Sequence, residues 1–225
     1  EHRWRFFLGT FVLSGLFASL LRAQLAPPNE AFLVIYLYVG TLLAILLASG
    51  PISTDRTHPT WKFMLAPPVS DADFMTVKWL IGLLQLLGTL LVALLVGLAI
   101  LWNQDIPYTL ELKLAVFSTV SLVCWYSILF VVSLRASSEG LAGLLCITLT
   151  LGFTASLGYC SESLHAFFFC ALNINPFILY LACTEPKLVP HPYLLSIFHL
   201  VVWVGLSLCV LRFKQGRLLR SWSKV

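Results

Sequence analysis

The chain has 225 residues and a formal net charge of +4 at pH 7, and 59% of its residues are hydrophobic while only 11% are charged. Because a soluble globular domain carries about 25% charged residues, a chain with a mean hydropathy of +0.91 cannot cover a water-facing surface with polar groups. The composition therefore excludes a soluble domain, and the small net charge, located near helix ends rather than on one face, excludes nucleic acid as a partner.

Apolar runs with few or no charged residues follow one another along the chain. Each is long enough, or nearly so, to cross a hydrocarbon core about 30 Å thick at about 1.5 Å per residue. Backbone amides in lipid must be satisfied within their own segment, so these runs should be helices rather than barrel strands. We predict an all-α integral membrane protein with one transmembrane domain over 1–225. The six predicted transmembrane helices cover approximately residues 5–22, 31–49, 77–102, 113–134, 139–158 and 193–213.

A seventh apolar run precedes the last span and is interrupted by asparagine and proline. Six crossings with both termini in the cytoplasm leave only Arg22, Lys113 and Lys187 outside, as the positive-inside rule favours. We therefore predict a re-entrant or interfacial hairpin over 164–184 on the outer side, because broken backbone is tolerated at membrane depth where protein surrounds it. The candidate residues for this hairpin or for an outer gate are Asn173, Asn175, Pro176 and Phe177.

The largest polar connection on the cytoplasmic side joins the second and third spans over 50–76. Its centre is a short apolar group, Trp61, Phe63, Met64 and Leu65, with Lys62 among them. Two prolines then end any helix that this group forms. Next, Ser70 is expected to cap a new helix whose first turn holds Asp71 and Asp73, where the helix dipole favours acids. The pattern predicts a surface helix, a proline break and a capped helix that becomes the third span.

In this loop the chain resembles the permease subunits of ABC transporters with the type-2 exporter fold. That family carries an acidic-basic pair, a short helix with a Leu-rich end, a Pro-Val-Ser or similar tripeptide, polar residues and a lysine entering the third span. The matching positions here are Asp55-Arg56, Trp61 to Leu65, Pro68-Val69-Ser70, Asp71, Asp73 and Lys78, with Asn175-Pro176-Phe177 before the last span. The segment 57–60 departs from the family pattern, and the amphipathic helix usual before the first span is absent or cut to 1–5.

The resemblance implies a function and a set of partners. The chain would be a non-catalytic permease of an exporter, the segment Trp61 to Leu65 would dock into a separate cytoplasmic ABC ATPase, and ATP and Mg would bind that ATPase rather than this chain. A second permease copy or homologue and the lipid bilayer are the other expected partners, in the inner (plasma) membrane with both termini cytoplasmic. The rim charges expected to orient the docked loop are Arg56, Lys62, Asp71 and Asp73, beside Asp55 and Ser70.

The sequence lacks the motifs of an energy source or of a hydrolase. No G-x-x-x-x-G-K-[ST], H-E-x-x-H or G-x-S-x-G occurs, and ionisable residues are almost missing from the spans. The exception is His199, which we interpret as a hydrogen-bond partner between helices. We expect no catalytic residue, cofactor or metal in this chain. A scaffold or assembly subunit that does not transport is the alternative, and the sequence names neither the cargo nor its direction.

Small, hydroxylated and cysteine residues inside the spans are predicted to pack the bundle. A minority of the hydroxyls could line a path for an amphipathic or apolar cargo. For the cysteines outside the spans, the sequence leaves open one disulfide among Cys160, Cys170 and Cys183. The predicted packing residues are Gly82, Gly88, Thr89, Gly97, Ser118, Thr119, Ser121, Ser127, Thr148, Thr150, Gly152 and Thr154, with Cys124, Cys146 and Cys209.

Overall fold

The computed structural model describes residues 2–22, 27–57, 71–103, 108–134, 136, 138–162, 165, 175–180, 189 and 191–213, and every regular element among them is helical. Two of these elements, labelled η, are π-helical stretches inside longer helices. The elements are α1 (His2–Arg22), α2 (Pro28–Leu33), η1 (Val34–Val39), α3 (Gly40–Thr57), α5 (Asp71–Asn103), α6 (Thr109–Ser133), α7 (Glu139–Glu162), α10 (Pro192–His199), η2 (Leu200–Val204) and α11 (Gly205–Phe213).

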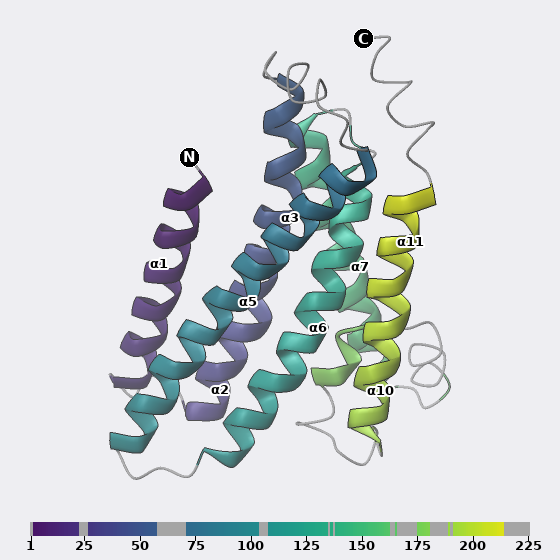
Figure 1. Ribbon diagram of the computed structural model, residues 1–225. Helices are drawn as coiled ribbons and strands as arrows, with labels where there is room; N and C mark the ends of the chain where they lie inside the picture. Colours follow the sequence, from purple (N-terminus) through teal and green to yellow (C-terminus); the bar gives the residue numbers. More distant parts are fainter. Residues whose placement is uncertain are drawn as a thin grey trace.

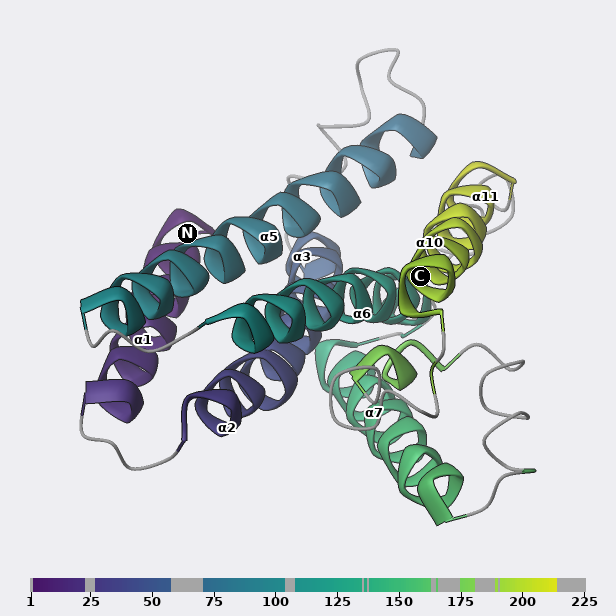
Figure 2. The ribbon, with the colours of Figure 1, turned by 90° about the horizontal axis from the view of Figure 1, so that it is seen from below.

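The elements α2 to α3 form one continuous helix, as do α10 to α11, and with these counted as single helices successive helices run in alternating directions through one bundle (Figure 1). The end of α3, the start of α5, the end of α6 and the end of α11 gather at the same end of the bundle, and the starts of α2 and α10 lie at the other. Seen along the bundle in Figure 2, α6 lies in the middle, with α5 on one side of it and α7 on the other. This arrangement places both flanks of the predicted cytoplasmic loop at one end.

Four of the described helices are long and apolar enough to cross a membrane. They are Pro28–Ser49, Asp73–Asn103, Thr109–Ser133 and Pro192–Arg212. The described apolar parts of α1 and α7, Gly9–Arg22 and Gly140–Ser156, are shorter. The all-helical membrane class is thus confirmed, while the count of six spans and the outer hairpin stay predictions.

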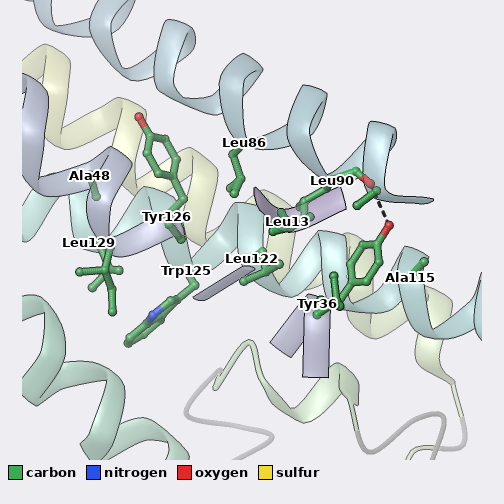
Figure 3. Close-up of a cluster of buried hydrophobic side chains, with 14 of the residues drawn as sticks. Leu13, Tyr36, Ala48, Leu86, Leu90, Ala115, Leu122, Trp125, Tyr126 and Leu129 are labelled. Carbon is green, nitrogen blue, oxygen red and sulfur yellow. Dashed lines mark hydrogen bonds between the residues drawn. The ribbon is translucent and has the colours of Figure 1, made fainter. Parts of the chain in front are cut away.

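The core of the bundle is built around α6, which packs against α2, α3, α5, α7, α10, η2 and α11. Its side chains are buried on nearly every face between Leu114 and Leu134, and Trp125 and Tyr126 are fully buried. Figure 3 shows residues of α6 meeting Tyr36 from η1 and Leu86 and Leu90 from α5. A helix that is apolar all round is expected at such a central position.

Small residues on α5 allow its neighbours to approach closely. A Cβ added at Gly97 would lie 2.5 Å from the Phe17 ring and 3.0 Å from the Phe32 ring, so only glycine leaves room for this pair, whose ring centroids are 4.7 Å apart. Thr89 bonds the hydroxyl of Thr10 on α1 at 3.1 Å. The prediction that small residues of the third span pack the bundle is confirmed at these positions.

The cysteine and histidine predictions have mixed outcomes. Cys124 and Cys146 are fully buried, as predicted, but Cys209 is exposed because it lies on the outward face of α11. His199 is also fully buried, yet neither ring nitrogen has a hydrogen-bond partner in the part of the chain that the structure describes, so the predicted interhelical bond is wrong there. The side chains of Cys160, Cys170 and Cys183 lie outside the described residues.

Candidate functional site

The residues predicted to dock an ATPase lie in the segment between α3 and α5 and in the ends of these two helices that flank it. Most of them fall outside the described residues, namely Trp61, Lys62, Phe63, Met64, Leu65 and Ser70. The structure does describe the backbone of the two helices that flank them. The described part of the candidate site therefore consists of these two flanking helices.

Both flanking helices extend into the segment predicted as a loop. On one side α3 continues past Gly50 and Pro51 to Thr57, so that Asp55 and Arg56 lie in its last turn. On the other side α5 begins at Asp71 and holds Asp73 exposed in its first turn. Because acidic residues stabilise the amino end of a helix, this start agrees with the predicted helix that follows Ser70.

Lys78 lies two turns into α5, at the point where the apolar run begins. Its Nζ atom lies 4.7 Å from the centroid of the Phe74 ring, one turn earlier on the same face. Residues four apart on a helix are neighbours, and an ammonium over an aromatic face is attracted to it. The pair directs the positive charge toward the end of the bundle where the predicted loop begins.

The start of α5 is joined to α6 by a buried tyrosine. The Tyr126 hydroxyl donates a hydrogen bond of 3.0 Å to the carbonyl oxygen of Trp79. A Cβ added at Gly82, one turn further along α5, would lie 2.1 Å from that hydroxyl oxygen and 3.0 Å from Cζ of the ring. Gly82 is therefore the position that lets the tyrosine reach the backbone of α5.

The middle of α3 is joined to the same helix by a serine. The Ser133 hydroxyl, in the last turn of α6, lies 2.8 Å from the carbonyl oxygen of Ala48 and 2.7 Å from that of Phe130 in its own helix. Gly40, nearer the other end of α3, approaches α6 closely, since an added Cβ would lie 2.6 Å from a Leu122 methyl group. Hence α3 contacts α6 along much of its length.

These contacts give the two flanks of the predicted loop one shared support. Tyr126 bonds α5 and Ser133 bonds α3, and the two residues lie two turns apart on α6. Packed helices move as rigid elements because protein interiors are dense and deform little. A displacement of the segment between α3 and α5 would therefore act on α6.

The residues predicted for the outer hairpin are buried where the structure describes them. Asn173 lies outside the described residues, whereas Asn175, Pro176 and Phe177 form a buried turn followed by a short helical stretch to Tyr180. The Asn175 amide nitrogen donates at 3.0 Å to both the Phe153 carbonyl oxygen and the Ser156 hydroxyl. The Asn175 side-chain oxygen accepts a bond of 3.0 Å from the Phe177 amide, which closes an Asx turn.

Sequence reasoning did not identify Tyr126 or Ser133 as site residues. Both lie within an apolar run that carries no motif, so their roles depend on which neighbours the folded chain places beside them. The spacing of glycines on α5 was the available signal, because Gly82 was expected to permit close helix packing. Within the described ranges, no group of three or more His, Cys, Asp and Glu residues is placed to hold a metal ion.

Long apolar helices packed around a buried central helix define the chain as a multi-pass membrane protein. A family model described as ABC-2 family transporter protein matches residues 10–214. Since this match covers most of the 225 residues, the chain belongs to the ABC-2 transporter family and is a permease-type membrane component of an ABC transporter. No curated protein and no solved structure is significantly similar to the chain.

Proposed function

We propose that this permease couples ATP hydrolysis by a separate cytoplasmic ABC ATPase to the movement of a substrate across the membrane. ATP and Mg bind the ATPase, and the segment 50–76 receives its movement. The proposal is carried by one observation, namely that the two helices bounding this segment, α3 and α5, are hydrogen-bonded to the same buried helix, α6. A loop with both flanks fixed to the bundle core can transmit force, whereas a loop attached to a loosely packed helix would only bend.

The apolar group Trp61, Phe63, Met64 and Leu65 is proposed to anchor the contact. Large buried apolar side chains dominate the binding energy of protein interfaces, and charged residues at the rim orient the partner. The proposed rim contains Arg56, Lys62, Asp71 and Asp73, beside Asp55 and Ser70. The exposure of Asp73 at the start of α5 is compatible with such a rim position.

The assembled transporter is proposed to contain a second permease copy or homologue and to reside in the inner (plasma) membrane with both termini cytoplasmic. The placement of the α3 end, the α5 start and the α11 end at the same end of the bundle supports a cytoplasmic carboxyl terminus (Figure 1). Charged residues are scarce in the spans, and a charge near the bilayer centre is costly without a partner. The cargo is therefore proposed to be apolar or amphipathic.

Co-purification tests the ATPase contact. The double substitution Trp61→Ala and Phe63→Ala should abolish co-purification with the ATPase and its stimulation. Trp102→Ala is the matched control, because Trp102 is a 70% exposed aromatic residue at the other end of α5 and should affect only anchoring in the membrane. An equal yield of the ATPase with the double variant and with the control would overturn the proposed function, as would the absence of any P-loop protein from the purified complex.

A further inference from the structure

Two adjacent residues of α6 connect different parts of the bundle. Trp125 and Tyr126 are both fully buried, and Figure 3 shows their rings leaving α6 on opposite sides. Neighbouring positions on a helix are separated by about 100° of rotation, so two consecutive large side chains point in different directions and can contact different elements. The partners of Tyr126 and Trp125 therefore lie on different sides of one rigid helix.

Tyr126 is in direct contact with the first part of α5. Its hydroxyl bonds the Trp79 carbonyl oxygen at 3.0 Å, eight residues after α5 begins at Asp71. Because Gly82 has no side chain, the hydroxyl lies directly against the backbone of α5, in the place that a Cβ would take. A movement of this end of α5 must move Tyr126 or break the contact.

Trp125 contacts α7 and the buried turn before the last helix. Its ring nitrogen donates to the Thr150 hydroxyl at 3.1 Å. The centroid of its ring lies 4.8 Å from that of Phe153 and 5.1 Å from that of Phe177. Phe177 belongs to the turn that Asn175 fastens to α7, so Trp125 forms part of the surface against which the turn packs.

The two contacts share one helix backbone and cannot change independently. A rotation of α6 that follows α5 through Tyr126 would shift the Trp125 ring against Phe177, because adjacent residues of a rigid helix turn together. Packed interfaces respond to such shifts by changing between discrete arrangements rather than by continuous deformation. The turn that would respond, 175–180, is buried on the side of α6 away from the start of α5.

We propose that Tyr126 and Trp125 are positioning residues for transport, which carry the movement of the start of α5 through α6 to the turn at Asn175–Tyr180. The inference rests on the proposed function, since it supposes that an ATPase moves the start of α5. It adds the route by which that movement reaches the opposite side of the bundle.

Cysteine labelling at the turn tests the route in the assembled complex. Tyr180 is half-buried at the end of the turn, so the labelling rate of a Tyr180→Cys variant by a small maleimide reports how far the turn is open. The complex would be compared without nucleotide and after trapping with ATP and vanadate, with labelling of position 180 quantified by mass spectrometry. We expect the labelling rate to differ several-fold between the two states in this parent variant.

The measured quantity is the ratio of the two labelling rates at position 180, with ATP and vanadate and without nucleotide. Adding Tyr126→Phe should reduce this ratio to near one, because the ring remains but its bond to α5 is lost. Trp125→Leu should do the same, and Trp125→Phe should restore part of the ratio by keeping an aromatic contact with Phe177. The matched control is Tyr36→Phe, which removes a similar buried bond of 2.9 Å from a tyrosine to the α5 carbonyl oxygen of Leu90, away from Trp125. It should leave the ratio unchanged.

The outcomes separate the route from the proposed function. If Tyr126→Phe keeps the full ratio, or if the parent shows no nucleotide response while the ATPase binds and hydrolyses ATP, the route is overturned and the function stands. If the ATPase does not bind the parent, the proposed function is overturned. Loss of the ratio in Tyr126→Phe, with ATPase binding and hydrolysis retained and with Tyr36→Phe behaving as the parent, supports the route.

Discussion

Replacing Gly82 with alanine should weaken the joint between α5 and α6. An added Cβ would lie 2.1 Å from the Tyr126 hydroxyl oxygen, a distance that real Cβ atoms do not show, so the tyrosine must move away. Its ring is enclosed in the core and its hydroxyl bonds the Trp79 carbonyl oxygen at 3.0 Å. The substitution therefore overpacks the joint and breaks this bond at once.

The expected magnitude follows from three terms. Overpacking a dense core costs about 1–3 kcal/mol, and a buried hydroxyl that loses its partner costs about 1–3 kcal/mol. Alanine regains about 1 kcal/mol over glycine in a helix interior. The free energy of unfolding should thus fall by about 1–5 kcal/mol for Gly82→Ala.

The assay can use thiols that the fold buries. Cys124 and Cys146 are fully buried, so their labelling rate in mild detergent measures how often the bundle opens. Because each loss of about 1.4 kcal/mol is tenfold in an opening equilibrium, Gly82→Ala should speed the labelling of Cys124 at least several-fold. Adding Tyr126→Phe removes the atom at 2.1 Å and leaves Cζ at 3.0 Å as the nearest, so the double variant should be more protected than Gly82→Ala alone.

Gly152→Ala on α7 is the matched control. An added Cβ at this helical glycine would meet nothing within 4 Å, so the substitution should leave labelling unchanged or slow it. Equal protection of Cys124 in Gly82→Ala and Gly152→Ala would refute the reasoning, because it would mean that Tyr126 does not occupy the space beside Gly82.

Three further predictions concern the last helix, the buried turn and the topology. His199→Leu should raise the free energy of unfolding by about 1–3 kcal/mol, because it removes two buried nitrogens that lack a partner among the described residues; a loss of stability in chemical unfolding would point to a polar partner instead. Asn175→Ala should lower stability by about 3 kcal/mol, since three bonds of about 1 kcal/mol each are lost, while Ser156→Ala should cost about 1 kcal/mol in the same measurement. Single cysteines at positions 60 and 215 should react with an impermeant thiol reagent from the same side of the membrane, and reaction from opposite sides would contradict the assigned topology.

The helical class and the approximate places of the helices could be predicted from composition and run length. In lipid the backbone amides of a segment must form hydrogen bonds within that segment, so an apolar run of sufficient length folds as an α-helix. The start of the α5 helix could also be predicted, because Ser70, Asp71 and Asp73 form a local capping pattern that needs no tertiary contact. The resemblance in the loop then identified the family, in agreement with the family match over residues 10–214.

Other features depended on distant parts of the chain. Nothing local marks Tyr126 within its apolar run, yet in the folded chain its hydroxyl meets a glycine on α5. The orientation of Cys209 likewise depends on which face of α11 packs inward. Whether the ring nitrogens of His199 find a hydrogen-bond partner depends on the side chains of the helix that faces it. Such features could not be read from a single apolar run, because every face of it is compatible with either lipid or protein.

The sequence by itself determined that this protein resides in a lipid bilayer, that its apolar segments are helical, and where its longest polar connection lies. These follow from local chemistry, namely the hydropathy of each run and the backbone hydrogen bonds it must satisfy. Only the tertiary structure decided that α6 supports both flanks of that connection and that Trp125 and Tyr126 hold different neighbours. Side chains of similar hydropathy acquire distinct roles through packing, and packing is a property of the assembled bundle rather than of any one segment.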